Sequence, residues 1–354
     1  MCVMCAYVGK KKQAAPLLLE SGKRIEGLWS GYYTGIGVLG NDGVIRNHKT
    51  TGCSKCWESR FSVEELPGTV GFFHSRTNSG GDSRYAHPFL SADGSVLLIS
   101  QGSGGHFKAD QQKLVEIGNR LLDQNTRFSS ADYNAATQKY PNLKDGSQVH
   151  ASDLVTEYAA DACKRLGDPF AAVHETASVL REESVSLFLF RDWPEHIYVA
   201  NMNQRLCLHF QDDGAFLSTC ALALGDTRRR LLEIPPNSVS EVTAGTIKVE
   251  PLAQDIVVDT RIPAGLLESF IRYLSQHPSS LLAHITDNAI APHYTGERIE
   301  MRAAAAYDIF ERLYYDGMLK LENTHLPGAG KDQSISALIS LNNSHPFHYT
   351  ESQS

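Results

Sequence analysis

The sequence predicts a layered α+β domain followed by a small helical segment. Up to about residue 250, short apolar runs typical of strands alternate with helical ones, and after about Val257 the pattern becomes helical. Strands interleaved with paired helices favour sheets covered by helix layers, and two sheets between helices are one such arrangement. The chain has 354 residues, more than one ordinary domain of about 150 residues requires.

Ten strands are expected in the first part of the chain, from short runs rich in β-branched and aromatic residues. The expected strands are Val3–Val8, Gly35–Leu39, Thr69–His74, Ser95–Ser100, Val185–Phe190, His196–Ala200, Cys207–Gln211, Ala215–Ser218, Ser238–Thr243 and Thr246–Val249. The last two flank Ala244 and Gly245, which suit a tight hairpin turn.

Two helices are expected between these strands. Asp110–Arg120 and Ser152–Leu166 repeat apolar residues at helical spacing, and Ser152 is the expected N-cap of the second helix. Gln124–Gly146 is polar and rich in turn residues, so it is expected to form a long loop or an insertion.

The last part of the chain is expected to be a helical appendage over residues 258–326. Apolar residues repeat at helical spacing in Ala264–Gln276, Ser280–Ala291 and Arg302–Tyr315. The short run Met318–Glu322 that follows is compatible with a hairpin. Residues 327–354 lack a periodic pattern and are expected to form a mobile tail. The expected division is therefore 2–250, 258–326 and 327–354.

Composition excludes several classes of partner. The 33 basic and 40 acidic residues give a net charge of -7 without a long basic block, which argues against nucleic acid. No run approaches the roughly 20 apolar residues of a membrane span, and Met1–Lys12 lacks the apolar core of a signal peptide. We therefore expect no membrane partner and a cytoplasmic location, where the seven cysteines would be thiols.

Cys2 is the first candidate catalytic residue. Removal of Met1 would leave a cysteine with a free α-amine at the start of the chain. An α-amine has a pKa of about 8, so a fraction is unprotonated at neutral pH and can accept the thiol proton. One residue would then supply both nucleophile and base, although the same pattern also fits an ordinary processed terminus.

Further motifs along the chain bear on the role of Cys2. In chain order they are Met1–Lys10, Gln13–Leu19, Ser30–Gly35, Gly71–Arg76, Ala86–Pro88, Ser100–Gly102, Ser152–Asp153 and Ile234–Val239. Together these segments resemble the class II glutamine amidotransferases, most of all the glutaminase domain of glucosamine 6-phosphate synthase. The resemblance covers roughly residues 2 to 250.

The resemblance implies a four-layer αββα sandwich of the N-terminal nucleophile hydrolase type, in which two stacked antiparallel sheets lie between helix layers. The nucleophile would begin the first strand. The implied reaction hydrolyses the side-chain amide of glutamine through a cysteine thioester, releasing glutamate and ammonia, and it needs no cofactor.

The resemblance also implies a role for each site residue. Cys2 would attack the amide, and Gln101 and Gly102 would stabilise the oxyanion. Arg76 would bind the substrate α-carboxylate and Asp153 its α-amine. Thr77 would belong to the loop that covers glutamine.

Five positions depart from the family pattern. Gln101 replaces an asparagine, Val3 replaces a glycine, and Thr77 replaces the tryptophan of the synthase. In the second motif, Ser30 replaces an arginine and Tyr33 an aspartate. Gln101 is one methylene longer, and a misplacement of about 1 Å can cost on the order of a hundredfold in rate. Two alternatives therefore stay open: a weakly active or inactive regulatory or scaffold protein that keeps the fold, and a hydrolase of another amide.

Two Cys-x-x-Cys pairs suggest a competing site. Cys2 with Cys5 and Cys53 with Cys56 have the spacing of a four-thiolate zinc site. Cys5, however, lies in a run that predicts a buried strand, so no metal is expected at the first pair. Three alternatives stay open for Cys53 and Cys56. The pair could bind a metal together with other ligands, form a redox disulfide, or do neither.

Length bears on the partners. Taking 250 from 354 leaves 104 residues without a βαβ pattern, too few for the sugar-isomerase domain of the synthase. The resemblance then implies an ammonia acceptor on another protein, or simple hydrolysis of glutamine or a related amide. A homo-oligomer is left open.

Overall fold

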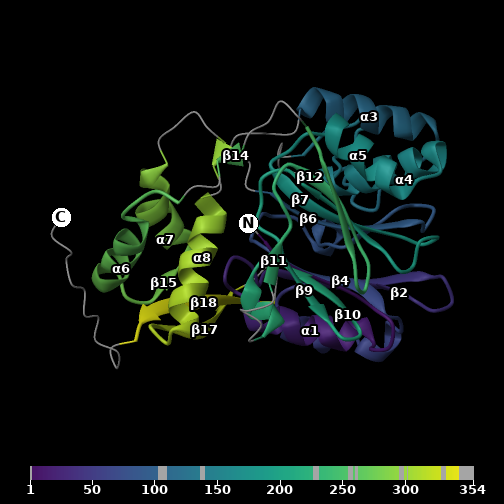
Figure 1. Ribbon diagram of the computed structural model, residues 1–354. Coiled ribbons are helices and arrows are strands. Elements are labelled where there is room, and N and C mark those ends of the chain that lie inside the picture. Colours follow the sequence, from purple (N-terminus) through teal and green to yellow (C-terminus); the bar gives the residue numbers. More distant parts are fainter. Residues whose placement is uncertain are drawn as a thin grey trace.

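The computed structural model describes residues 2–102, 110–135, 140–225, 231–253, 258–259, 262–294, 299–300, 302–327 and 332–342. Two antiparallel sheets lie face to face in the first part of the chain (Figure 1). The seven-stranded sheet has the order β11 (Leu231–Glu233), β9 (Cys207–Gln211), β10 (Gly214–Ser218), β1 (Val3–Gly9), β4 (Val70–Arg76), β2 (Tyr33–Leu39), β3 (Ile45–Thr51). The six-stranded sheet has the order β13 (Ile247–Pro251), β12 (Ser238–Val242), β8 (Ile197–Asn201), β7 (Ser184–Phe190), β6 (Val96–Gly102), β5 (Phe89–Leu90).

Side-chain alternation along β1 separates two cores. Met4, Ala6 and Val8 pack between the two sheets, whereas Val3 and Cys5 face the outer layer. This alternation follows from the twofold period of a strand, and it lets one buried strand serve both cores. The first strand is therefore fixed at the centre of the sandwich.

Helices cover both outer faces. α1 (Ala14–Ile25) packs on the seven-stranded sheet, and α3 (Gln111–Asp123), α4 (Ala151–Leu166) and α5 (Pro169–Val179) lie over the six-stranded sheet (Figure 1). Short elements join these layers: α2 (Ser54–Glu58), η1 (Val63–Glu65), η2 (Ser83–Tyr85) and η3 (Ala221–Leu224). The four-layer αββα sandwich is confirmed.

The N-terminus of α4 differs from the prediction. His150, not Ser152, is the N-cap, and its ring Nδ1 accepts a 3.1 Å hydrogen bond from the backbone N–H of Ser152. The imidazole satisfies one of the backbone donors that every helix start leaves unpaired.

Residues 258–342, here called the C-terminal segment, contain more than helices. The helical elements are α6 (Leu266–Gln276), α7 (Leu282–Ile285), η4 (Thr286–Ile290), η5 (Ala291–His293) and α8 (Arg302–Tyr315). The strands are β15 (Ser280–Leu281), β17 (Leu319–Pro327) and β18 (Gln333–Leu341) in one sheet, and β14 (Val258–Asp259) and β16 (Ile299–Glu300) in a parallel pair.

The prediction of a mobile tail from residue 327 is wrong for β18. Ile335, Ala337 and Ile339 alternate with polar or outward-facing residues, a period-two pattern that pairs this strand with β17 over its full length. Residues 343–354 of the expected tail lie outside the described residues.

The hairpin of β17 and β18 also contacts the sandwich. The backbone N–H of Ile335 donates to the carbonyl oxygen of Gly31 at 3.2 Å, and the N–H of Ala337 donates to the carbonyl oxygen of Gly27 at 2.9 Å. Gly31 has φ +99°, and a Cβ there would lie 2.1 Å from the Ile335 carbonyl oxygen. Glycine permits this close approach.

Within the described part of the chain, no helix combines the length and apolar character needed to cross a membrane.

Candidate active site

Cys2 lies directly before β1, between the two sheets. Strand alternation places its side chain on the same face as Met4, toward the six-stranded sheet. Its backbone N–H donates a 3.1 Å hydrogen bond to Oε1 of Gln101, which comes from β6. The start of the chain is thus tied to the facing sheet by one hydrogen bond.

The thiol of Cys2 has an unusual ionisation. Burial raises its pKa, but a hydrogen bond with His74, the charge of that imidazole and the backbone N–H of Thr77 lower it, to about 6. His74 is fully buried on β4, with Nε2 3.1 Å from the carbonyl oxygen of Ser100. A thiol with this pKa is largely thiolate at neutral pH, the form that attacks carbonyl carbon.

Gln101 and Gly102 end β6 beside the nucleophile. Because Oε1 of Gln101 accepts from the Cys2 N–H, its amide Nε2 is the group left to donate elsewhere. The Gln101 side chain is buried, whereas Gly102 is exposed. The longer side chain therefore still reaches Cys2.

Arg76 is a buried cation at the end of β4. Its Nη1 donates to the Gly80 carbonyl oxygen at 2.9 Å, its Nη2 donates to the Tyr140 hydroxyl at 2.8 Å, and its guanidinium lies 4.7 Å from the ring centroid of Tyr33. Among the described residues it forms no ion pair with a carboxylate. Since buried charges are normally paired, this guanidinium suits an anionic ligand.

Thr77 begins the loop that follows β4. Its backbone N–H points at the Cys2 thiol and helps to lower the pKa of that group. Further along, Gly80 and Gly81 adopt φ values of +81° and +87°, and the Gly81 carbonyl oxygen accepts from the Tyr33 hydroxyl at 2.9 Å. The loop thus contacts Cys2 through Thr77 and Arg76 through Gly80.

Asp153 is fully buried in the first turn of α4. Its Oδ2 accepts three hydrogen bonds, from the Ser129 hydroxyl at 3.1 Å, the Ser130 N–H at 2.7 Å and the Ser130 hydroxyl at 2.8 Å. Burial raises the pKa of this carboxyl in spite of these bonds. Its Oδ1 is buried and has no partner in the described part of the chain, so one carboxylate oxygen is fixed and the other is open to a ligand donor.

The chain was compared with known proteins, and no family model matches it. It is 32% identical over 303 residues to the glutamine–fructose-6-phosphate aminotransferase (isomerizing) of Methanothermobacter thermautotrophicus, covering 81% of this chain and 46% of the relative. It is 24% identical over 248 residues to the protein of that name from Bacteroides thetaiotaomicron, covering 69% of this chain and 36% of the relative. The chain therefore spans less than half the length of these relatives.

Solved structures agree on the fold. The glutamine phosphoribosylpyrophosphate amidotransferase of B. subtilis, solved with ADP and GMP, superposes with a TM-score of 0.55 at 13% identity, over 91% of this chain and 66% of that one. A structure described as the allosteric regulatory enzyme of purine biosynthesis gives a TM-score of 0.52 at 14% identity, over 77% and 52% of the two chains. The chain is a relative of the class II glutamine amidotransferases. This relationship indicates an enzyme of the glutamine amidotransferase type.

Two residues near the site make contacts that the sequence did not predict. Tyr140 reaches Arg76 from the long loop after α3, and His87 stacks on His74 with ring centroids 4.2 Å apart. Burial lowers the pKa of His87, so its ring is neutral, and its two nitrogens have no partner within the ranges given above. The Ala86-His87-Pro88 motif was the only signal for His87, and nothing in the loop composition singled out Tyr140.

The two Cys-x-x-Cys pairs do not form a common site in the described residues. The thiol of Cys5 lies 3.7 Å from the Ser218 hydroxyl inside the sandwich, whereas Cys53 and Cys56 begin α2. Across the ranges that the structure describes, no group of three or more His, Cys, Asp and Glu side chains is arranged to hold a metal ion.

Proposed function

We propose that this chain, after removal of Met1, hydrolyses the side-chain amide of glutamine through a thioester on Cys2. The observation that carries the proposal is the hydrogen bond between the Cys2 N–H and Oε1 of Gln101. It brings the Cys2 nitrogen and the side-chain amide of Gln101 together, which leaves Nε2 as a donor beside the nucleophile. Arg76 and Asp153 then offer one buried positive and one buried negative group for the two charges of an amino acid.

The first half of the reaction forms the thioester. The Cys2 thiolate attacks the amide carbon, while the α-amine of the same residue holds the proton that the thiol has lost, as an ammonium. Nε2 of Gln101 and the backbone N–H of Gly102 donate to the oxygen that becomes negative. When the C–N bond breaks, the α-ammonium returns the proton to the leaving nitrogen, which departs as ammonia.

The second half releases glutamate. Water attacks the thioester carbon while the α-amine accepts its proton, and the C–S bond breaks to restore the thiolate. Arg76 would hold the α-carboxylate and Oδ1 of Asp153 the α-ammonium throughout. The Thr77 loop would cover the bound amino acid and exclude other nucleophiles.

The fate of the ammonia is a separate part of the proposal. The named relatives are aminotransferases of fructose-6-phosphate, and this chain covers less than half of their length. We propose that any acceptor site lies on a partner protein or on a part of the protein beyond the described residues.

The test uses purified protein whose N-terminal residue has been determined. Wild type should produce glutamate and ammonia from glutamine in equal amounts, and a glutamine-like electrophile such as 6-diazo-5-oxo-L-norleucine should label Cys2. C2A should lose both, while C56S, which removes a distant and partly exposed thiol, should keep both. Retained Met1, or neither turnover nor labelling by the processed protein, would refute the proposal; glutamine binding without turnover would favour the regulatory alternative.

A further inference from the structure

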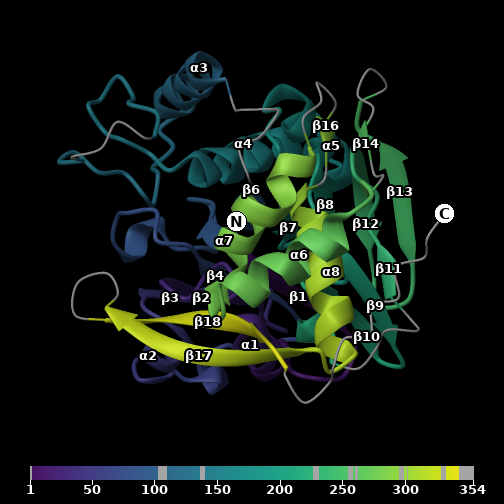
Figure 2. The same cartoon turned by 90° about the vertical axis from the view of Figure 1, so that its left-hand side faces the viewer.

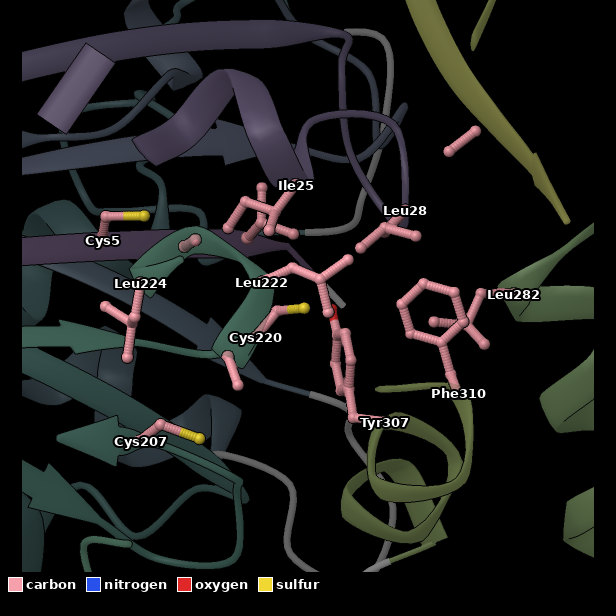
Figure 3. Close-up of a cluster of buried hydrophobic side chains, with 14 of the residues drawn as sticks. Cys5, Ile25, Leu28, Cys207, Cys220, Leu222, Leu224, Leu282, Tyr307 and Phe310 are labelled. Atoms are coloured by element: carbon pink, nitrogen blue, oxygen red, sulfur yellow. The ribbon is translucent and has the colours of Figure 1, made fainter. Parts of the chain in front are cut away.

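The C-terminal segment lies against the end of the sandwich where β1 begins (Figures 1 and 2). The two parts share one hydrophobic core, since Val3, Ile25 and Leu28 of the sandwich belong to the same buried cluster as Phe310 and Ile339. Figure 3 shows Leu28 of the sandwich close to Phe310 and Leu282 of the C-terminal segment. This segment is therefore a wall of the region around Cys2.

Helix α8 is anchored by a buried ion pair. Arg205 donates from Nη1 and Nη2 to the two carboxylate oxygens of Glu311, at 2.5 and 2.7 Å, and the Ala221 N–H donates to Glu311 Oε1 at 2.7 Å. Both charged side chains are at least nine-tenths buried. A bidentate pair with an added backbone donor fixes the helix in position as well as in orientation.

The anchor fixes Tyr307 of α8 in the hydrophobic cluster that also contains Val3, the first residue of β1. Tyr307 extends toward Cys220, which follows the end of β10, the strand next to β1, by two residues (Figure 3). On the other side, the ring of Tyr307 lies 5.1 Å from that of Trp29. Trp29 is two residues before Gly31, whose N–H donates at 2.9 Å to Ser75, the partner of Val3 on β4.

The hydroxyl of Tyr307 is buried there. The residue is 1% exposed, and among the residues that the structure describes its oxygen has no hydrogen-bond partner. Burial raises its pKa, with contributions from Cys220, Glu311 and Cys2 against Arg205, so the hydroxyl keeps its proton. Leaving such a group unsatisfied costs about 1–3 kcal/mol, so a hydroxyl at this place is expected to serve a ligand or a chain end.

We propose that Tyr307 positions the free α-amine of Cys2, with its hydroxyl oxygen accepting one amine N–H. This inference rests on the proposed function. A neutral amine has two N–H bonds and one lone pair. Oε1 of Gln101 accepts one N–H and Tyr307 accepts the other, which leaves the lone pair to hold the proton that the Cys2 thiolate has given up. The sandwich supplies one support of the base, and the C-terminal segment supplies the second.

The test compares Y307F with wild type and with Y314F. Tyr314 lies on the same helix, half-buried beside Phe310, and its hydroxyl is not part of the proposal. Two readouts are needed: kcat and KM for glutamine, and the pKa of the N-terminal amine from the pH dependence of its acylation, followed by mass spectrometry of the N-terminal peptide. The second readout needs no turnover, and thermal unfolding checks that each variant is folded.

We expect Y307F to lower kcat about 10-fold to 100-fold, the range of a misplaced proton-transfer group, with KM changed less than about twofold. The α-amine pKa should fall by about one unit, because the ammonium form loses an acceptor. Y314F should match wild type in both. An unchanged α-amine pKa in folded Y307F would overturn the inference, even if kcat falls. If wild type does not hydrolyse glutamine, the proposed function fails, and the acylation profile alone decides the role of Tyr307.

Discussion

Nη2 of Arg76 donates a 2.8 Å hydrogen bond to the hydroxyl of Tyr140, a residue 64 positions further along the chain. The ring of Tyr140 also packs against those of Tyr85 and His150, at 5.3 and 4.5 Å. A loop side chain therefore occupies the guanidinium edge that we assign to the substrate carboxylate.

Removal of this hydroxyl should favour the substrate. In Y140F the carboxylate no longer competes with the phenol oxygen for Arg76, so KM for glutamine should fall about 3-fold to 10-fold with kcat unchanged, as expected for one hydrogen bond to a charged group. Steady-state kinetics checks this, with Y133F as the control on an exposed tyrosine of the same loop. A higher KM in Y140F would mean that the hydroxyl helps to bind the carboxylate.

Gln101 should act mainly on the rate. Q101A removes both the acceptor of the Cys2 N–H and the proposed oxyanion donor, so kcat should fall by about 10²–10³. KM should change little, because Arg76 and Asp153 bind the other end of the substrate. The measurement is kcat at saturating glutamine, and a Q101A enzyme within twofold of wild type would exclude the assigned role.

The Cys2 thiol should titrate well below an ordinary thiol. Its pKa of about 6 predicts that alkylation by iodoacetamide rises with pH to a midpoint near 6, since the thiolate is the reacting form. H74Q removes the imidazole hydrogen bond and charge, so the midpoint should move up by about one unit or more. Cys5, whose thiol pKa burial raises to about 12, is an internal reference that should stay unmodified at pH 7. A wild-type midpoint near 8.5 would contradict the site electrostatics.

Glu157 predicts a pH dependence of stability. It is buried on α4, where it accepts a 2.7 Å hydrogen bond from the Ala92 N–H, and burial raises the pKa of this carboxyl to about 8. The folded state thus holds a proton that the unfolded state loses near pH 4.3, so this contribution is present below pH 4.3 and is lost as the pH rises through 8.

The variant E157Q should remove that dependence. At pH 8 its free energy of unfolding should exceed that of wild type by about 1–3 kcal/mol, and at pH 4 the two should agree. Urea unfolding at both pH values measures this, with the exposed Glu116→Gln change on α3 as the control. A variant less stable than wild type at pH 8 would show that the carboxyl is ionised in the fold.

Local patterns predicted much of the fold. The helix Arg302–Tyr315 has the predicted bounds, and β9 matches Cys207–Gln211, because each repeats apolar residues at the period of its own element. The sequence pattern did not predict helices α1 and α5, because their composition does not differ clearly from that of the neighbouring segments. The alternation in Gln333–Leu341 is present in the sequence, but the polar, turn-rich stretch before it favours a loop.

The candidate site was less accessible to such reasoning. The motif resemblance identified Cys2 and Gln101 as candidate site residues, and a hydrogen bond joins them in the structure. The contacts of Tyr140 and Tyr307 depend on how a loop and a distant helix pack, which no local period encodes. A single residue type in a polar loop carries no signal of the partner it will meet.

The core that crosses from the sandwich into the C-terminal segment has a consequence for the energetics of the whole chain. Val3 and Phe310 are buried in the same cluster. Unfolding of either part would therefore expose apolar side chains of the other to water. The chain should therefore unfold in one cooperative transition, and a version cut at residue 250 should expose an adhesive apolar face and aggregate.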